Sequence, residues 1–451
     1  MKNNNQATII VIVGISGDLS RRKLLPAISK IAEAGEIPDK YKIVGVTRKI
    51  NSSISELLSK TENPDSIADN LELFEMDLTE PRDYLKLADH LLEIEKEFNE
   101  PAQRLFYLSV PPQISRPIIE QLGVSGLSLI RDTKLLLEKP FGVDLASAKE
   151  LTENINKYFT SEQVYRIDHY LAKETAQNII VFRQDNSLFK RTWNKDFIER
   201  IEIIAQENIG VEGRAIFYEQ TGALRDLVQS HLLQLAALVL MDIPSDRQLA
   251  DIPARRFEAL KYLRLPTDEP IDNNVVRGQY ESYQKEVNNI GSTVETFVSL
   301  TLKSDNPKWQ GVPIILTTGK ALDDKFTGIK ILYKKDESYE ANELVLRLQP
   351  NEGVELFLWA KKPGYDYQVS QHSLKFNFQE YYKNFPEAYE QVLFNAINSD
   401  HSLFASSDEV LETWKIIDVI QKSWEMSADD LIIYPVGSSI ENILDKNNHS
   451  L

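Results

Sequence analysis

The sequence contains no cysteine. This absence excludes a disulfide framework, a zinc ribbon or iron–sulfur cluster, and a thiol nucleophile. The chain also has no long hydrophobic run, because no stretch approaches the roughly 18–20 apolar residues that a membrane span requires. The apolar run that begins at Ala7 reaches Asp18 too soon to serve as a signal peptide. We therefore expect a cytoplasmic protein without a membrane partner, whose chemistry uses groups other than thiols.

Positive charge is in the minority. The 451 residues include 51 Lys and Arg against 68 Asp and Glu, which gives a net charge of −17. An acidic balance along the whole chain disfavours nucleic acid and anionic membranes as partners, so an anionic substrate would need a local basic pocket. The five Trp, 18 Tyr and 18 Phe, together with 42 % hydrophobic residues, exclude a disordered chain. The length favours two domains of roughly 150–250 residues each.

The first third of the chain alternates short apolar runs with helical patterns. Strands are expected at residues 8–13, 42–46, 73–76, 104–110, 133–137 and 164–167. Helices are expected between them, at 22–34, 83–98, 115–122 and 145–158. Strand, helix and strand at a spacing of roughly 30 residues are typical of a doubly wound parallel sheet. We therefore predict a Rossmann-like cofactor domain over residues 1–175.

The pattern changes from about residue 197. Strand-like runs now follow one another, at 198–205, 296–302, 312–317, 329–333 and 343–349. Strands in succession favour a mostly antiparallel sheet. Residues 176–451 are therefore predicted to form a larger α+β domain, in which helices cover that sheet. The expected fold class is α/β followed by α+β.

The first expected strand runs into a glycine-containing turn and then into a helix. The turn reads Gly14-Ile15-Ser16-Gly17-Asp18-Leu19-Ser20. Glycines at such a turn let backbone N–H groups approach a pyrophosphate, and the start of the helix adds partial positive charge. The spacing is Gly-x-x-Gly, with Ser20 where a third small residue would pack. The alternative is a tight turn of the kind found in any α/β protein.

The end of the second expected strand bears on the choice of cofactor. NAD-binding folds place Asp or Glu there to accept hydrogen bonds from the ribose 2′-hydroxyl. This chain has Thr47-Arg48-Lys49 instead. Two cations suit a 2′-phosphate and favour NADP. The alternative is a solvated basic loop.

Two polar motifs follow the fifth and sixth expected strands, at residues 138–142 (Glu-Lys-Pro-Phe-Gly) and 166–174 (Arg-Ile-Asp-His-Tyr-Leu-Ala-Lys-Glu). Ligands bind at the carboxyl ends of parallel strands. If a helix begins at His169, then His169 and Lys173 share a face one turn apart, with Tyr170 beside them. Such a set could donate hydrogen bonds to a phosphate. The alternative is a surface cluster of salt bridges.

His231 lies in an otherwise apolar helical pattern, where a histidine is more often a hydrogen-bonded core residue than a catalyst. Asp226 is five residues earlier, about 140° around an α-helix. We therefore expect the two side chains to border a cleft at one end of the helix without stacking on one another. Glu207 supplies another carboxylate at an expected strand end. Lys320 and Lys325 follow a further strand, where an ordinary turn with exposed lysines is the alternative.

Together these motifs resemble the glucose-6-phosphate 1-dehydrogenase family. The matching stretches occur in family order from near the first residue to about Gly437, and they are 14–19, 138–142, 166–174, 210–214, 225–234, 276–280, 293–298, 311–313, 319–322 and 349–352. The Arg-Ile-Asp-His-Tyr-Leu segment is highly specific. The resemblance implies oxidation of glucose 6-phosphate at C1 to 6-phosphoglucono-1,5-lactone, with hydride transfer to NADP, as in the first step of the oxidative pentose phosphate pathway.

The resemblance also implies roles for single residues. His231 is similar to the general base of the family and Asp168 to the carboxylate that orients it. The residues similar to those that bind substrate are Lys139, His169, Tyr170, Lys173, Glu207, Asp226, Lys320, Lys325 and Gln349. Those expected at the cofactor are Gly14, Ser16, Gly17, Asp18, Leu19, Arg48, Lys49 and Lys139. A cis peptide bond at Pro140 is implied as well, and we expect a homodimer or homotetramer and no metal.

The sequence departs from the family pattern at several positions. Ala172 replaces a glycine, Ser230 replaces an asparagine, Glu219 replaces an aspartate, and residues 439–441 lack an expected Trp-Gly-Pro. None of these changes removes a proposed catalytic group.

Two other functions stay open. A related Rossmann sugar dehydrogenase would act on unphosphorylated sugars, against which the cluster of His169, Tyr170 and Lys173 argues. A catalytically silent sensor of NADP and sugar phosphate would be expected to lose the base, whereas this chain has both His231 and Asp168.

Overall fold

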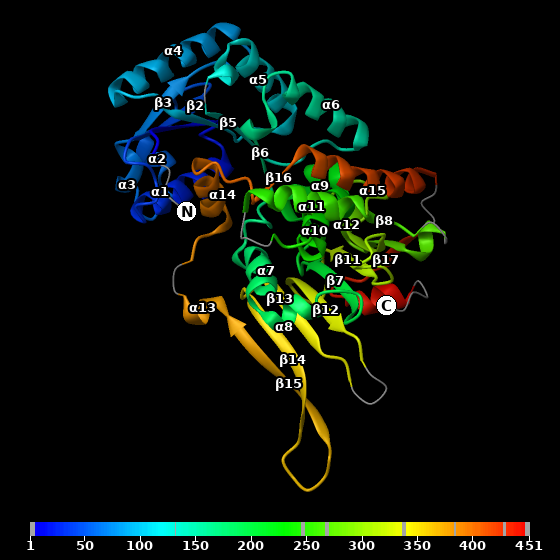
Figure 1. Ribbon diagram of the computed structural model, residues 1–451. Helices are drawn as coiled ribbons and strands as arrows, with labels where there is room; N and C mark the ends of the chain where they lie inside the picture. The colour runs from blue at the N-terminus through cyan, green and yellow to red at the C-terminus, as the bar shows by residue number, and fades with distance from the viewer. Residues whose placement is uncertain are drawn as a thin grey trace.

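The computed structural model describes residues 5–130, 132–244, 249–266, 270–335, 340–382, 385–426 and 430–446. Two sheets organise these residues. A seven-stranded sheet formed mostly by the N-terminal part stands beside a ten-stranded sheet formed by the C-terminal part, with a layer of helices between them (Figure 1). The expected fold class is confirmed.

The seven-stranded sheet has the order β16-β6-β5-β4-β1-β2-β3. Six of its strands pair with one another in parallel, and they are β1 (Thr8–Val13), β2 (Tyr41–Thr47), β3 (Leu71–Glu75), β4 (Gln103–Leu108), β5 (Thr133–Leu137) and β6 (Val164–Ile167). The central strands β1, β4 and β5 are buried along their whole length, as parallel strands covered on both faces are. Val13 lies opposite both Val46 and Leu108, so the turns after β1, β2 and β4 meet at one edge.

Helices cover both faces of this sheet. The longer ones are α1 (Leu25–Glu33), α4 (Pro81–Phe98), α5 (Pro112–Val124) and α6 (Leu145–Asn156). The short ones are α2 (Ile54–Leu57), α3 (Asp65–Ala68), η1 (Ser20–Leu24), η2 (Leu127–Leu129) and η3 (Ser161–Gln163). Each long helix buries an apolar stripe on the sheet, such as Leu87, Leu91 and Ile94 of α4.

The ten-stranded sheet has the order β15-β14-β13-β12-β7-β11-β10-β9-β17, with β8 paired to β10. Its strands are β7 (Ile198–Gln206), β8 (Leu263–Arg264), β9 (Val275–Tyr280), β10 (Phe297–Ser304), β11 (Ile314–Gly319), β12 (Phe326–Tyr333), β13 (Glu343–Gln349), β14 (Gly353–Lys361), β15 (Val369–Asn377) and β17 (Leu431–Tyr434). The sheet is antiparallel except where β7 pairs with β11 and β9 with β17. The prediction of a mostly antiparallel sheet is confirmed.

The helices of the C-terminal part pack mainly between the two sheets (Figure 1). They are α7 (Glu174–Asp185), α8 (Ser187–Thr192), α9 (Ala215–Ala223), η5 (Leu224–Leu232), α10 (Leu233–Leu240), α11 (Ile252–Lys261) and α15 (Ser407–Met426). Shorter elements are η4 (Glu212–Arg214), η6 (Leu249–Asp251), η7 (Ile271–Asn273), α12 (Tyr283–Glu286), α13 (Phe378–Tyr381) and α16 (Ile440–Asp445). Of these, η5 packs against β7 and β11 on one side and against α15 on the other.

Late in the chain, the backbone returns to the first sheet. Helix α14 (Ala388–Ile397) packs on α1, and β16 (Phe404–Ala405) pairs antiparallel with β6 (Figure 1). The buried Lys134 of β5 fixes this return, because its Nζ donates to Gln103 Oε1 at 2.7 Å and to the carbonyl oxygens of Ala396 at 2.5 Å and Ile397 at 3.2 Å. A single domain boundary at residue 175 would assign this returning segment to the second domain, although it packs on the first sheet. The boundary stays a prediction.

Among the described residues, none of the helices combines the length and the apolar character that crossing a bilayer demands.

A buried ion pair ties the returning segment to the helical layer. Arg256 of α11 is 1 % exposed, and its Nε donates to Glu409 Oε1 of α15 at 2.7 Å. Its two terminal nitrogens donate to the carbonyl oxygens of Ser402 and Phe404, each at 2.5 Å. Removing one partner of such a pair leaves an uncompensated buried charge.

Replacing Arg256 by Leu should therefore lower the free energy of unfolding by about 3–5 kcal/mol, measured by urea denaturation. The double variant Arg256→Leu/Glu409→Gln removes both charges and should recover part of that loss. Lys261→Ala, which breaks an exposed pair on the same helix, is the control and should leave the midpoint nearly unchanged. An Arg256→Leu protein that unfolds at the parental urea concentration would contradict this account.

Candidate active site

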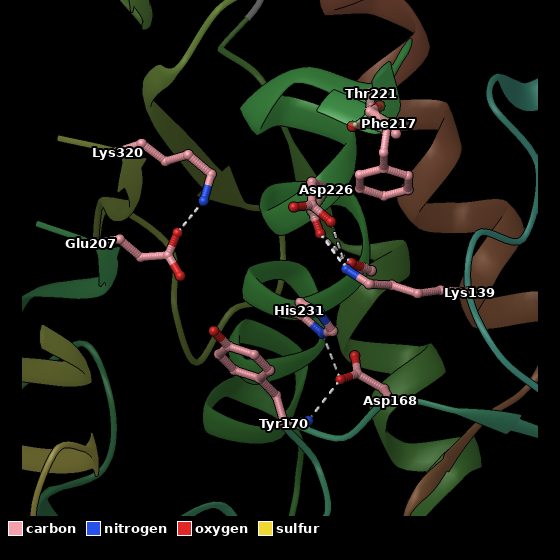
Figure 2. Close-up of polar contacts among 10 residues, drawn as sticks. Lys139, Asp168, Tyr170, Glu207, Phe217, Thr221, Asp226, His231 and Lys320 are labelled. Atoms are coloured by element: carbon pink, nitrogen blue, oxygen red, sulfur yellow. Dashed lines mark hydrogen bonds and ion pairs between the residues drawn. The ribbon is translucent and has the colours of Figure 1, made fainter. Parts of the chain in front are cut away.

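The polar residues singled out in the sequence meet where the first sheet faces the helical layer. Lys139 follows β5, and Asp168 and Tyr170 follow β6, so both segments start at the carboxyl ends of parallel strands. Helix η5 supplies Asp226 and His231 from the C-terminal part. Figure 2 shows the side chains of these residues converging from the two sides. The site therefore exists only where the two parts of the chain are joined.

His231 and Asp168 form the centre of this site. The ring Nδ1 of His231 lies 2.6 Å from Asp168 Oδ1, and the same oxygen accepts the backbone N–H of Tyr170 at 2.9 Å. The Tyr170 ring stacks on the His231 ring, with 4.2 Å between their centroids and 17° between their planes. Both His231 and Asp168 are buried. The imidazole is thus held on its edge and on one face.

Burial controls the protonation of this pair. It lowers the pKa of His231 well below 6.5, and the nearby Lys139 ammonium acts in the same direction. Burial also raises the pKa of Asp168, although the neighbouring His169 and the N–H of Tyr170 oppose that shift. With Nδ1–H donated to the carboxylate, the Nε2 atom of a neutral His231 is a proton acceptor.

Asp226 and His231 lie on one face of η5, so the expectation that they would be separated by about 140° is wrong. That expectation used α-helical geometry. The described helix is a π-helix, in which N–H groups bond to the carbonyl five residues earlier, as Leu233 does to Val228. Residues five apart are then roughly one turn apart. The helix therefore presents Asp226 directly above His231 (Figure 2).

Lys139 reaches across to Asp226. Its Nζ donates to Asp226 Oδ1 at 2.9 Å and to the carbonyl oxygen of the same residue at 2.8 Å. Burial alone would raise the pKa of Asp226, but the Lys139 ammonium holds it below its ordinary value. The peptide bond between Lys139 and Pro140 is cis, as the family resemblance implied.

No helix begins at His169, so the condition for His169 and Lys173 to share a helical face is not met, and α7 begins only at Glu174. Residues 168–173 form a turn in which the Asp168 side chain accepts the N–H of Tyr170, and the carbonyl of Asp168 accepts the N–H of Leu171 at 3.1 Å. An Asp side chain that bonds to the backbone two residues later competes with helix formation. The turn brings Asp168 and Tyr170 to the same imidazole.

The phosphate set predicted from this motif is only partly brought together. The His169 ring lies 4.6 Å from the His231 ring, and burial lowers the pKa of His169 to about 3, so it is neutral. Lys173 lies at the rim, 18 % exposed, with its Nζ 3.7 Å from Glu352 Oε1. Tyr170 is buried, with its ring against His231.

A second pair of opposite charges faces the first. Glu207 follows β7 and Lys320 follows β11, and because these strands are parallel neighbours, the two side chains form an ion pair at the sheet edge (Figure 2). The Lys320 ammonium also lies 5.3 Å from the centre of the Tyr218 ring. Lys325, by contrast, is exposed. Of the two lysines predicted from this loop, the structure brings only Lys320 into contact with another site residue.

Gln349 ends β13 and reaches the site through Thr327. Its Nε2 donates to Thr327 Oγ1 at 3.0 Å, and Thr327 also bonds the Tyr170 hydroxyl. Gln349 is therefore linked through Thr327 to Tyr170, the residue that stacks on His231.

Ligating atoms of Asp168, His169 and His231 all lie within 4.8 Å of one another, close enough to hold a metal ion. The hydrogen bond between Asp168 and His231 already accounts for the approach of two of the three.

A separate cleft of about 590 Å³ opens at the edge where β1, β2 and β4 end. Gly14, Ser16, Gly17, Arg48 and Lys49 line it, as predicted for a cofactor site. The backbone at Gly14 has a φ of +90°, and a Cβ there would lie 2.4 Å from the carbonyl oxygen of Ser109, so this tight approach requires glycine.

Two other predicted cofactor residues lie beside the cleft rather than in its wall. Asp18 is exposed and pairs with Arg22 at 2.7 Å, and Leu19 packs on the core of the first sheet. Ser20 fills the position of the third small residue as expected. It is buried, and its hydroxyl donates to the carbonyl of Gly14 at 3.1 Å and lies 2.9 Å from Ser109 Oγ, at hydrogen-bond distance.

The opposite wall of the cleft was missed by the sequence analysis. It consists of Ser109, Val110 and Pro111, which follow β4, and of Ile114 at the start of α5. The signal was present, because ligands of doubly wound sheets bind where strand order reverses, here between β1 and β4.

The residues that depart from the family pattern make ordinary hydrogen bonds or pack in the core. Ser230 donates its hydroxyl to the Asp226 carbonyl at 2.9 Å, and Ala172 is fully buried in the core. Glu219 accepts from Tyr283, Ser292 and Asn289 at 2.7, 2.7 and 2.6 Å. Ser439 caps α16 by accepting the N–H of Asn442 at 3.2 Å.

Comparison with known families agrees with this geometry. Residues 11–178 match the family model described as "Glucose-6-phosphate dehydrogenase, NAD binding domain", and residues 180–447 match "Glucose-6-phosphate dehydrogenase, C-terminal domain". The chain belongs to the glucose-6-phosphate dehydrogenase family. The family resemblance stated from the motifs is confirmed, and with it the assignment to oxidoreductases that use a nicotinamide cofactor.

Individual glucose-6-phosphate dehydrogenases match over nearly their whole length. The chain is 34 % identical over 461 residues to the glucose-6-phosphate 1-dehydrogenase of Streptococcus pneumoniae serotype 4, covering 95 % of this chain and 92 % of the relative. A solved glucose-6-phosphate dehydrogenase in complex with its substrate glucose-6-phosphate superposes with a TM-score of 0.90 at 30 % identity, covering 99 % of this chain and 98 % of that one. The Gal80p super-repressor mutant from Saccharomyces cerevisiae shares the fold alone, with a TM-score of 0.56 at 12 % identity over 93 % of this chain and 97 % of that one.

The depressed pKa of His231 gives a direct prediction. A histidine whose charged form is disfavoured by burial stays neutral as the pH falls through 6.5 and takes up its proton only at lower pH. A titration of the histidine ring nuclei by NMR measures this, with His231→Asn used to assign the signal. A His231 signal that titrates at or above pH 6.5 would contradict the inferred effect of burial.

Proposed function

We propose that this protein oxidises D-glucose 6-phosphate at C1 to 6-phospho-D-glucono-1,5-lactone and passes the hydride to NADP. The observation that carries the proposal is the buried hydrogen bond between His231 and Asp168, next to three lysines that enter from different elements. Family membership makes this reaction the first candidate. The residues then have to supply a proton acceptor and an anion site.

His231 is the proposed general base. Removal of a hydride from C1 requires the proton of the C1 hydroxyl to leave as well, and a neutral imidazole accepts it at Nε2. Asp168 holds the tautomer through Nδ1 and stabilises the imidazolium that forms. The Tyr170 ring prevents the imidazole from turning, because it lies parallel to it at 4.2 Å. Bound NADP supplies the hydride acceptor.

Lys139, Lys173 and Lys320 are the proposed cations of the substrate site. The protein carries a net charge of −17, so a phosphorylated sugar must find its positive partners locally. His169 is neutral and, with Tyr170, contributes hydrogen-bond donors rather than charge. Glu207, Asp226 and Gln349 are assigned to the sugar hydroxyls, which carboxylates and amides can bond.

Arg48 and Lys49 are proposed to select NADP. Both are exposed at the wall of the cofactor cleft. Two carboxylates lie near the end of the neighbouring strand β3. Glu75 accepts the backbone N–H of Ile50 at 3.0 Å. Asp77 accepts the backbone N–H and the hydroxyl of Thr79 at 2.9 and 2.8 Å, and these bonds, together with the nearby Arg48, hold its pKa below the ordinary value. The loop is therefore held in place, and both cations stay exposed to meet a 2′-phosphate.

Two alternatives remain less well supported. A sugar dehydrogenase for unphosphorylated sugars has no use for three lysines around one site. A catalytically silent sensor has no use for a buried base held by a carboxylate, which costs desolvation energy without contributing to binding.

We also propose that the protein is a homodimer or homotetramer in the cytoplasm. The hairpin of β14 and β15 projects from the body of the molecule (Figure 1) and exposes Tyr365, Tyr367, Val369 and Leu374. β15 is an edge strand, and a long apolar edge favours association. Light scattering coupled to gel filtration measures the mass, and a monomeric mass would contradict the assembly.

The replacement of His231 by Asn tests the proposed reaction. It removes the base while keeping a polar side chain of similar size, so turnover should fall by about 10²–10⁴-fold with little change in substrate binding. The measurement is reduction of NADP followed by absorbance, with glucose as well as glucose 6-phosphate. His90→Asn, at a surface pair with Glu72, is the matched control. Retention of more than about a tenth of parental turnover would show that another residue is the base.

The cofactor choice is tested at Arg48. Charge-assisted bonds to a phosphate contribute roughly 1.5–3 kcal/mol, or about 10- to 150-fold in affinity. Arg48→Ala should therefore raise KM for NADP by that factor and change KM for NAD little. Arg264→Ala, at a partly exposed arginine that pairs with Asp305 outside the cleft wall, is the control. Equal increases for NADP and NAD would refute the assignment of Arg48 to the 2′-phosphate.

A further inference from the structure

Glu295 is a buried carboxylate to which the proposed reaction gives no role. It lies two residues before β10, within the stretch 293–298 that contributes to the family resemblance, and is 8 % exposed. Its carbonyl oxygen accepts the N–H of Ala223 at 3.0 Å, and its Oε1 accepts the N–H of Leu224 at 2.9 Å. Glu295 therefore binds two successive N–H groups at the start of η5, the helix that carries Asp226 and His231.

A π-helix depends more than an α-helix on such a contact. Its hydrogen bonds span five residues, so one more N–H group at its start lacks a partner within the helix. Buried N–H groups without partners cost free energy comparable to a lost hydrogen bond. Glu295 supplies two of the acceptors from outside the helix.

The backbone at Gly222, just before η5, adopts a conformation that leaves room for the Glu295 carboxylate. Gly222 has φ 63° and ψ 178°, which breaks the helical path between α9 and η5. A Cβ at this position would lie 2.3 Å from Glu295 Oε1. Only glycine fits there, because both the backbone conformation and the contact exclude a side chain.

The next residue ties the same segment to Lys320. The carbonyl of Thr296 accepts the N–H of Lys320 at 2.9 Å. The Tyr434 hydroxyl donates to the Lys320 carbonyl at 2.8 Å and lies 2.9 Å from Thr296 Oγ1. The two residues Glu295 and Thr296 thus contact both the helix of His231 and the loop of Lys320, which stand on opposite sides of the site (Figure 2).

We propose that Glu295 is a positioning residue, which fixes the start of η5 by accepting the N–H of Leu224 and so places Asp226 at Lys139 and His231 at Asp168. It touches neither substrate nor cofactor, and it acts through the register of the π-helix. The expected effect of Glu295 on kcat rests on the proposed function, whereas its expected effect on the helix does not.

Three substitutions separate the hydrogen-bond acceptor from the charge. Glu295→Gln keeps an oxygen at the same distance, Glu295→Asp withdraws it by one methylene, and Glu295→Ala removes it. Displacement of a catalytic group by about 1 Å can cost about 10²-fold in rate. We expect kcat to fall at least about 10-fold in the Asp and Ala variants and to stay within about threefold in the Gln variant. KM for NADP should stay within about twofold in all three, because the cofactor cleft lies on the other sheet.

The matched control is Ser299→Ala. Ser299 lies further along β10, is buried, and bonds Thr317 Oγ1 of β11 at 2.9 Å, so its loss disturbs the same strand without touching η5. Its kcat should stay within about twofold of the parent. Should the Ala variant fail to fold, the Asp variant carries the comparison with Gln.

Hydrogen–deuterium exchange supplies a readout that needs no substrate. Amides of residues 222–232 should exchange faster in the Asp and Ala variants than in the parent, the Gln variant or Ser299→Ala. The proposal is overturned if exchange there is unchanged, if Gln impairs kcat as much as Ala, or if KM for NADP rises together with the loss of kcat. If the parent itself oxidises no sugar phosphate, the proposed function fails, while the exchange comparison still decides whether Glu295 fixes the helix.

Discussion

The π-helical hydrogen bonding of η5 is the constraint on which the site depends. Because its N–H groups bond to the carbonyl five residues earlier, Asp226 and His231 lie roughly one turn apart and face the same direction. Asp226 then meets Lys139 at 2.9 Å, and His231 meets Asp168 at 2.6 Å. Both contacts join the carboxyl end of the first sheet to the C-terminal part of the chain. In an α-helix the two side chains would point about 140° apart, so η5 would not present both of them to the same side of the site.

Each sheet contributes to the site according to its own topology. In the parallel sheet, the ends of β5 and β6 lie side by side, which brings Lys139 next to Asp168 and leaves the end of β1 and β4 for the cofactor cleft. In the mostly antiparallel sheet, the parallel pair of β7 and β11 places Glu207 beside Lys320. That pair is an exception to the antiparallel pattern, and it is the reason that a strand-end carboxylate and a strand-end lysine reach the same edge.

The sequence predicted the parts of the site that depend on local pattern. Six strands of the first sheet lie within two residues of their expected bounds, and Gly14, Arg48, His231 and Asp168 occupy strand ends or the helix expected for them. The errors arose where a hydrogen bond outweighs local periodicity. The side chain of Asp168 turns residues 168–173 away from a helix. Over nine residues, an apolar pattern does not separate the repeat of an α-helix from the wider repeat of a π-helix. The return of α14 and β16 to the first sheet depends on Lys134, whose partners are about 260 residues away.

The charges of the site explain how an acidic protein can hold cations ready for an anion. Lys139, Lys173 and Lys320 each face a carboxylate, those of Asp226, Glu352 and Glu207. An isolated ammonium at these partly buried positions would lose its hydration without compensation. Its carboxylate partner offsets that loss and holds each lysine in place, so an anionic ligand that enters finds donors already positioned. On the proposed function, the pair of Lys173 and Glu352 would accommodate a phosphate at the smallest cost, because its charged atoms are 3.7 Å apart, beyond ordinary hydrogen-bond distance. The same arrangement would then favour a phosphorylated sugar, since a neutral sugar brings no charge to replace the carboxylate that each lysine already has.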